Sequence, residues 1–188
     1  DNSGMIMDNE TIIKSPVNLL RQLTAARVAI GRCGSSLPSG ELLDFNLCHA
    51  RARDAVHIPL DFEKTASDIS SSAGVDVVIL ESMASTREEY LRRPDLGRRL
   101  SADSLKRLDP GEERYDISLS VADGLSSMAI ERNAAFFLSK LVPALRCEYT
   151  LAPVALIRHG RVAVADEVAR AFRSEMAVIF IGERPGLK

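Results

Sequence analysis

Three short segments rich in glycine and charged residues contain the side chains best suited to bind a ligand. They are Asp123–Ser126, Arg158–Val162 and Gly182–Gly186. Their glycines allow close backbone approach, their carboxylates accept hydrogen bonds, and Val162 offers an apolar contact. The sequence contains no G-x-G-x-x-G, G-x-x-x-x-G-K-[ST] or G-x-S-x-G motif. Neither a dinucleotide site, a P-loop nor a serine hydrolase is therefore indicated.

Each of these segments follows a predicted β-strand. Strands are expected at about 75–80, 117–121, 153–157 and 176–181. The last of these is fully apolar, which predicts a strand buried on both faces. Predicted helices separate the strands and favour a parallel sheet built from right-handed βαβ units. Since parallel strands deliver their following loops to one edge, the three segments should converge on a ligand-binding rim.

The helices expected beside this sheet have recognisable boundaries. They are a helix over 62–73 that ends at Gly74, one from a capping box at 85–88 to Pro94, one after Ser101, a long one over 130–145, and a short one over 166–173. The regular alternation of helix and strand places residues 61–188 in one α/β domain.

The N-terminal third is predicted to be helical. Ser15 and Pro16 are typical of a helix start, and this first helix should end at Gly31. A second helix over about 41–56 carries an apolar face that includes His49, which is expected to be a core or interface histidine. We therefore predict an α/β fold. A helical segment, 1–60, precedes a Rossmann-like, mostly parallel sheet with helices on both faces, 61–188.

Composition excludes several classes of partner and site. The formal net charge of −2 gives no electrostatic reason to expect nucleic acid, and no apolar stretch approaches membrane-spanning length. The N-terminus resembles neither a signal nor a transit peptide, so a cytoplasmic location is expected. The three cysteines are odd in number and lack C-x-x-C spacing. They are expected to be reduced and partly buried, and no metal site is predicted.

Several blocks of this sequence resemble one enzyme family. The blocks are Ala26–Val28 with Gly31–Gly34, Leu42–Phe45 leading to His49–Val56, Tyr90–Leu100, Asp123–Ser126, Gly160–Val162 and Gly182–Leu187. In this order and spacing they resemble the small subunit (light chain) of ethanolamine ammonia-lyase from about residue 20 onward. The resemblance implies a subunit of a carbon–nitrogen lyase that converts ethanolamine to acetaldehyde and ammonia with adenosylcobalamin.

The resemblance also implies how the work is divided between subunits. The catalytic groups would lie in a large subunit with a TIM barrel, and the two would form a hetero-oligomer. The light chain would hold part of the cobalamin at the interface, would carry no catalytic residue and would be inactive alone. Its expected cofactor contacts are Val162, through backbone and side chain, and Glu183, a carboxylate that can accept hydrogen bonds from corrin amides. A bacterial microcompartment could enclose such an enzyme.

Two departures from patterns of cobalamin proteins qualify this expectation. The Asp-x-His-x-x-Gly motif that ligates cobalt through histidine is missing, since Asp54–His57 has the wrong spacing. Dimethylbenzimidazole is therefore expected to stay on cobalt, the base-on form. A cysteine contact that the family carries further toward its C-terminus would come after Lys188. The site in this chain is thus expected to be recognisable but to lack the C-terminal portion.

Other interpretations of these residues stay open at this point. The chain could be a non-catalytic α/β scaffold or binding module that keeps only the fold. Glu183 and Arg184 could form a local surface ion pair, and Asp123–Gly124 could simply start a helix. The pairs Arg92–Arg93 and Arg98–Arg99 could form a solvated face or pair across a subunit interface. No function is assigned to His159.

Overall fold

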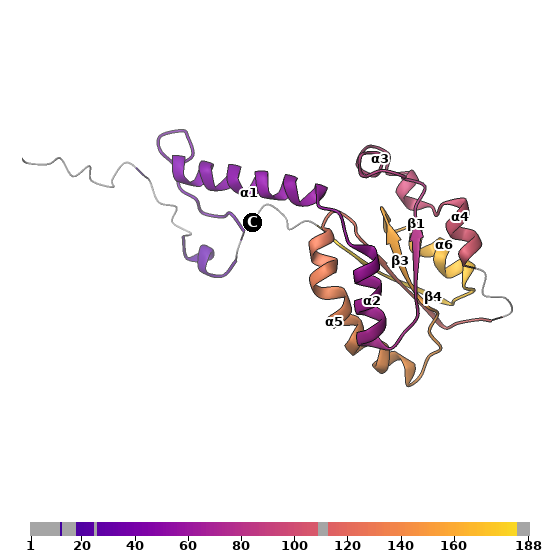
Figure 1. The fold of residues 1–188 in the computed structure, drawn as a ribbon. Helices are drawn as coiled ribbons and strands as arrows, with labels where there is room; N and C mark the ends of the chain where they lie inside the picture. The colour runs from indigo at the N-terminus through magenta and orange to yellow at the C-terminus, as the bar shows by residue number, and fades with distance from the viewer. Residues whose placement is uncertain (1–11, 13–17, 25, 109–112, 184–188) are drawn as a thin grey trace, which may run out of the picture. The chain divides into compact units, whose positions relative to one another are not determined.

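A four-stranded parallel sheet forms the centre of the larger part of the molecule (Figure 1). The computed structural model describes residues 12, 18–24, 26–108 and 113–183. It divides into two compact units, one containing residues up to Asp54 and the other beginning at Ala55.

The sheet has the strand order β1-β3-β2-β4. Its strands are β1 Val77–Glu81, β2 Ile117–Ala122, β3 Val154–Arg158 and β4 Met176–Ile181. All pairings are parallel, and Ala122 at the end of β2 is level with Ile157 in β3 and Ile181 in β4. The predicted parallel sheet is thus confirmed, and the loops that follow β2, β3 and β4 begin side by side.

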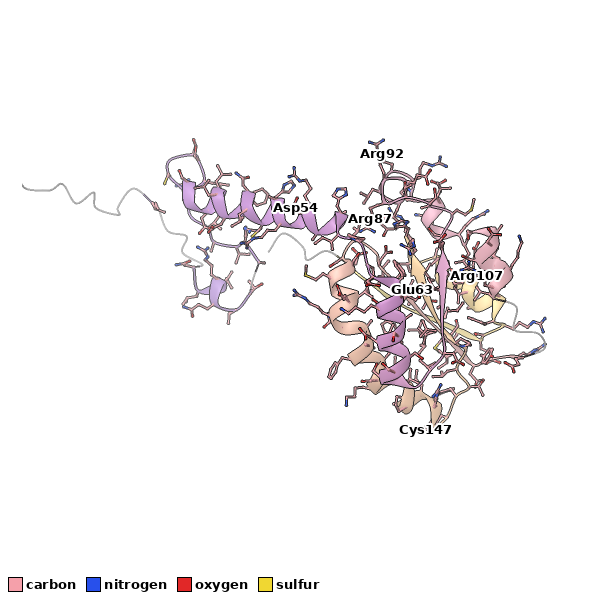
Figure 2. All side chains as sticks on the ribbon, in the orientation of Figure 1. Asp54, Glu63, Arg87, Arg92, Arg107 and Cys147 are labelled. Carbon is pink, nitrogen blue, oxygen red and sulfur yellow. The ribbon has the colours of Figure 1, made fainter. Side chains whose placement is uncertain are left out.

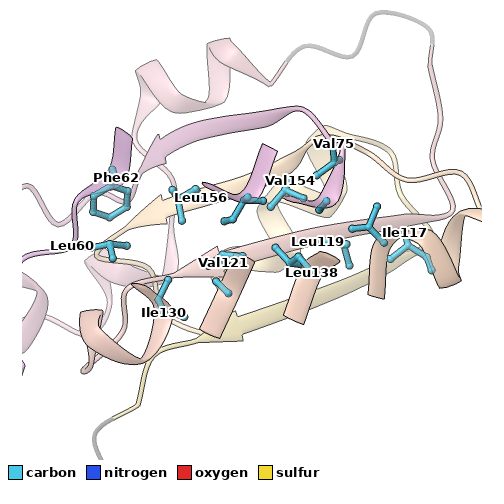
Figure 3. Close-up of a cluster of buried hydrophobic side chains, with 14 residues drawn as sticks. Leu60, Phe62, Val75, Ile117, Leu119, Val121, Ile130, Leu138, Val154 and Leu156 are labelled. Atoms are coloured by element: carbon cyan, nitrogen blue, oxygen red, sulfur yellow. The ribbon is translucent and has the colours of Figure 1, made fainter. Parts of the chain in front are cut away.

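Helices cover both faces of the sheet, as predicted. On one face, α2 (Phe62–Ala73) and α5 (Ser127–Arg146) pack over a core that includes Leu119, Leu156 and Leu138 (Figure 3). On the other face, α6 (Val164–Ala171) buries Val164 and Val168 against Ile157. This layering confirms the α/β fold class.

The remaining short helices lie between β1 and β2 in the chain. They are α3 Arg87–Arg92, the 3-10 helix η3 Leu96–Arg98 and α4 Ala102–Arg107. The capping box of α3 lies one residue later than predicted. Thr86 accepts a hydrogen bond from the Glu89 backbone at 3.2 Å, and the Glu89 carboxylate accepts from the Ser85 backbone at 3.0 Å. The helix ends before Pro94, as expected, because proline cannot continue it.

No residue of the apolar strand β4 is fully buried and its first two are exposed, so the prediction that it is buried on both faces was wrong. Among the described residues it pairs only with β2, and Met176 is 55% exposed. The interior strands are β3 and β2, and the residues of β2 are all buried, including Ser118 and Ser120. A continuous apolar run reflects contacts above and below the sheet and does not specify a neighbour on each side. A fully apolar sequence therefore does not by itself identify an interior strand of the sheet.

The N-terminal unit departs most from prediction. The described part of the first predicted helix contains only the 3-10 helix η2, Asn18–Gln22, and residues 13–17 lie outside the described residues. Leu19 and Leu23 are 73% and 81% exposed, so the apolar stripe is not buried within the described part of the chain. A short helix without tertiary packing is marginal in water. Ala29 also adopts a positive φ of 54°, which a right-handed helix excludes.

The second predicted helix is present as α1, Ser39–His57, but it buries no residue. His49 is exposed and stacks on Phe45 with ring centroids 6.3 Å apart, so it is not a core histidine. Among the cysteines, Cys33 and Cys48 are partly buried as expected, but Cys147 is exposed just after α5 (Figure 2). None of the described helices is long and apolar enough to cross a membrane.

Candidate functional site

The candidate site lies at the carboxyl edge of the sheet, between β2 and β3. The chain leaves β2 toward α5 on one face of the sheet and leaves β3 toward α6 on the other. Where adjacent parallel strands send their connections to opposite faces, a crevice opens at the carboxyl edge, and open α/β sheets bind ligands there. All three loops predicted to bind a ligand begin at this edge.

The loop after β2 is joined to both neighbouring loops. On the β3 side, the backbone of His159 donates to the Asp123 carboxylate at 2.8 Å. On the β4 side, the Gly182 carbonyl accepts from the Ser126 backbone at 3.0 Å and from the Leu125 backbone at 2.5 Å. Segments far apart in sequence are thus linked through Asp123–Ser126.

Two glycines make the β4 connection possible. Gly124 has a positive φ of 55°, and a Cβ atom there would lie 2.0 Å from the carbonyl oxygen of Gly182. A Cβ atom on Gly182 would lie 2.2 Å from the carbonyl oxygen of Ser126. Neither position admits a larger residue without moving the backbone. This contact explains why both blocks contain glycine.

Asp123 is a buried anchor of this edge, with 3% of its surface exposed. Besides the His159 backbone, its carboxylate contacts the Arg87 guanidinium at 3.5 Å. Burial raises the pKa of Asp123, while His159 and Arg87 act in the opposite direction. Asp123 does not cap the following helix, since the Ser126 hydroxyl oxygen accepts the capping hydrogen bond from the Ala129 backbone. Its role is therefore more than that of a helix-start residue.

His159 adopts a backbone conformation that is uncommon outside glycine, with φ of 55°. Its backbone nitrogen donates to Asp123, its carbonyl accepts from the Ser82 hydroxyl at 2.9 Å, and its Nδ1 lies 3.1 Å from the Ala84 carbonyl. These contacts compensate for the strain. Sequence reasoning assigned no function to His159, because its partners lie 36 to 77 residues away in the chain.

The two residues expected to contact a cofactor follow the strands on either side of β2. Val162 is 61% exposed, and Glu183 is exposed. Strand spacing puts the ends of β3 and β4 roughly 10 Å apart. An apolar side chain and a carboxylate are thus accessible along one rim. Arg184 lies outside the described residues, so the alternative of a Glu183–Arg184 ion pair stays untested.

An apolar groove of about 480 Å³ lies between α5 and β4, and among the described residues that line it Asn133 alone is polar. Phe137 and Phe180 face each other in it, with ring centroids 5.1 Å apart. The groove has too few polar groups to orient a ligand. We therefore place the candidate site at the loops, where charged and polar groups gather.

The paired arginines on the α3–η3 segment are exposed within the described residues. Arg92 projects outward and pairs with Glu88 at 2.9 Å, and Arg93 pairs with Asp95 at 2.6 Å (Figure 2). Arg98 and Arg99 are exposed as well. These observations agree with a solvated face. Pairing across a subunit interface stays a prediction.

Comparison with known proteins identifies close relatives. A protein-family model described as "Ethanolamine ammonia-lyase light chain (EutC)" matches residues 14–188. Ethanolamine ammonia-lyase small subunits from Pseudomonas aeruginosa (strain LESB58) and Pseudomonas putida (strain GB-1) are 49% and 48% identical over 173 and 180 residues. The counterpart from Pseudomonas fluorescens (strain Pf-5) is 47% identical over 175 residues.

These alignments cover most of this chain but a smaller share of the relatives. They include 89%, 92% and 89% of this chain and 63%, 65% and 63% of the three relatives, respectively. The chain thus spans slightly less than two thirds of the length of the curated relatives it matches. The family match extends through both units and all three rim loops. The chain belongs to the ethanolamine ammonia-lyase light chain family.

Proposed function

We propose that this chain acts as the light chain of an adenosylcobalamin-dependent ethanolamine ammonia-lyase, which converts ethanolamine to acetaldehyde and ammonia. In this proposal its rim loops hold part of the cobalamin beside a catalytic large subunit with a TIM barrel. The observation that carries the proposal is that the loops of Val162 and Glu183 follow β3 and β4, the two strands that flank β2, at the same edge of the sheet. Both family blocks lie at the edge where α/β sheets bind ligands.

The chemistry of the exposed groups fits such a cofactor. The Glu183 carboxylate can accept hydrogen bonds from the side-chain amides of a corrin, and Val162 can pack against its apolar surface. When bound, adenosylcobalamin supplies the radical that begins the reaction. The residues of this chain bind and orient the cofactor and shield it from water. None of them is proposed to be catalytic.

We further propose that cobalamin binds base-on, with dimethylbenzimidazole on cobalt. The histidine whose sequence context comes nearest to that motif is His57, at the exposed end of α1, and its spacing does not fit. The electron paramagnetic resonance spectrum of reduced cobalamin in the assembled enzyme should show coupling to the dimethylbenzimidazole nitrogen. A spectrum that instead shows coupling to a histidine nitrogen from the protein would contradict this proposal.

The proposed partner is the large subunit, and the relatives' name, "small subunit", supports this. We place the assembled enzyme in the cytoplasm. Any enclosing microcompartment is a further proposal that rests on the family resemblance.

Co-expression tests the function. The reading frame that encodes this chain should be expressed with and without a tagged large subunit, followed by affinity purification and an acetaldehyde assay with adenosylcobalamin. We expect co-purification and acetaldehyde from the complex, and none from either subunit alone. A light chain that does not co-purify, or that produces acetaldehyde by itself, would overturn the proposal. The former result would favour a non-catalytic scaffold or binding module.

A further inference from the structure

We infer that Tyr90 is a positioning residue for the Val162 loop: its ring and carbonyl hold Arg161, and so fix the backbone of 160–162 before a cofactor arrives. The benefit to cobalamin binding rests on the proposed function. The contact between Tyr90 and Arg161 itself does not.

Tyr90 lies at the centre of a stack of cationic side chains. It is a residue of α3 with 1% of its surface exposed. The guanidinium carbon of Arg161 lies 4.5 Å from the centre of its ring, and that of Arg87 lies 5.0 Å away. Cations over an aromatic face are attracted by the negative charge of the ring face. The Tyr90 ring therefore attracts two guanidinium groups, and one of them, that of Arg87, also contacts the buried Asp123 carboxylate at 3.5 Å.

Arg161 is held at both its backbone and its side chain. Its guanidinium Nη2 donates to the Tyr90 carbonyl at 2.7 Å, and its backbone nitrogen donates to the Gly97 carbonyl at 2.7 Å. A Cβ atom on Gly97 would lie 3.0 Å from Arg161 Cγ and 3.0 Å from the His159 carbonyl oxygen. The segment from Tyr90 to Gly97 therefore lies directly against the loop that follows β3.

Tyr90 also contacts the residue on the other side of Gly160. Its ring stacks on His159 with centroids 5.9 Å apart. His159 is fixed in turn by Asp123, which also contacts Arg87. Arg87 itself donates to the Val56 carbonyl at 2.7 Å. The loop is thus held before and after Gly160.

The contacts of Arg161 and His159 hold the backbone next to Val162 but leave its side chain accessible. Val162 directly follows Arg161, and its side chain stays 61% exposed. A loop that already has its bound conformation loses less conformational freedom on binding, which raises affinity. The inference connects two family blocks, Tyr90–Leu100 and Gly160–Val162, that are 60 residues or more apart in the sequence.

Two measurements test this inference on the light chain co-expressed with its large subunit. The first is amide hydrogen exchange over 159–163 in the absence of cofactor. The second is the cobalamin dissociation constant from an absorbance titration. Tyr90→Leu keeps an apolar side chain but removes the ring, so we expect at least tenfold faster exchange over 159–163 and about tenfold weaker cobalamin binding. Tyr90→Phe keeps the ring, and both values should stay within twofold of wild type.

A second variant keeps the test decisive if Tyr90→Leu does not fold. Arg161→Gln removes the stacked guanidinium from a half-buried position, and it should raise exchange and weaken binding in the same way. Lys106→Gln is the control, because Lys106 is an exposed cation on α4 that pairs with Asp103 at 3.1 Å. It should leave both values unchanged.

The outcomes separate the inference from the function on which it rests. If wild-type assemblies bind cobalamin but Tyr90→Leu and Arg161→Gln bind it equally well with unchanged exchange, the inference is overturned. The same holds if Tyr90→Leu lowers only the global unfolding midpoint. If wild type itself does not bind cobalamin, the proposed function fails, and the exchange measurement still decides whether Tyr90 orders the loop.

Discussion

The carboxyl edge of the sheet and helix α1 distribute polar and apolar side chains in opposite ways. At the edge, the carboxylate of Asp123 is 3% exposed and is held by residues from other segments. Along α1 no residue is buried, and Leu43 and Leu47 are 67% and 49% exposed. Buried polar groups need partners with defined geometry, whereas exposed apolar groups constrain nothing within the chain.

This difference shows which parts of the fold depend on tertiary contacts and which depend on local sequence. The edge depends on neighbours supplied by β2, β3, β4 and α3, so its geometry is specified by tertiary structure. Helix α1 depends mainly on its own backbone hydrogen bonds and on a few contacts at its partly exposed surface, such as the Phe45–His49 stack and the Arg21–Glu41 ion pair at 2.7 Å. Substitutions at the edge should therefore be costly for folding, and those along α1 should be tolerated.

The largest expected effect is that of Gly124→Ala. A Cβ atom at this position would collide with the Gly182 carbonyl, and the positive φ adds strain. We expect the free energy of unfolding to fall by about 3–5 kcal/mol. Urea denaturation followed by circular dichroism measures it. The control is Gly40→Ala in α1, where nothing lies within 4 Å of the added Cβ. It should be neutral or slightly stabilising; equal losses at both positions would contradict the comparison.

The next effect is that of Asp123→Ala, which leaves the His159 backbone nitrogen and the Arg87 guanidinium without their shared acceptor. We expect a loss of about 2–3 kcal/mol, because unsatisfied buried donors are costly. Denaturation should be compared with Asp54→Ala, an exposed aspartate on α1 that should change stability by less than about 0.5 kcal/mol. A small effect at Asp123 would show that water satisfies these donors.

Asp123 should also give a pH-dependent difference in stability. Burial raises its pKa above the ordinary 3.8, so the folded state binds this proton more strongly than the unfolded state does. Its stabilising contribution is complete below the ordinary value and is lost as pH rises through the folded pKa. The unfolding free energy of wild type minus that of Asp123→Asn should therefore decrease from about pH 4 upward. A difference that grows with pH would mean that the Arg87 pairing dominates.

The smallest effect is expected on α1. Leu43→Ser should change the free energy of unfolding by no more than about 0.5 kcal/mol, because the side chain is exposed. The matched substitution in a packed helix is Leu138→Ala in α5, 1% exposed, which should cost about 2–5 kcal/mol. If Leu43→Ser cost as much, α1 would have to be packed in the folded chain.

The sequence allowed the convergence of the rim loops to be predicted. Alternation of helix and strand specifies a parallel sheet, and a parallel sheet places Asp123, His159 and Gly182 at one edge. The ends of α2, at Phe62 and Gly74, were also predictable. The sequence signals are a stripe of apolar residues and the glycine that follows it. In the structure Gly74 caps the helix with a positive φ of 61°.

What the sequence could not supply are contacts between distant segments. Nothing in the Tyr90 block indicates that its ring lies against Arg161, because no local pattern encodes that contact. Likewise, β4 is more apolar than β2, yet β2 is an interior strand, since strand order depends on crossovers rather than on hydropathy. The prediction of the first N-terminal helix was wrong for the opposite reason, because here the local pattern was present and the tertiary contacts were not observed within the described ranges. Its stripe at Leu19 and Leu23 satisfies the pattern, but both side chains are exposed among the residues that the structure describes.

Substitution of Glu183 is the sharpest test of whether the rim of this chain binds cobalamin in the assembled enzyme. The measurement is the cobalamin dissociation constant, by absorbance titration, of complexes carrying wild-type or Glu183→Ala light chain. Because loss of a charged acceptor costs about 1.5 kcal/mol, we expect Glu183→Ala to bind cobalamin about tenfold more weakly, with an unchanged unfolding midpoint. Equal dissociation constants for the two complexes would show that Glu183 does not contact the cofactor.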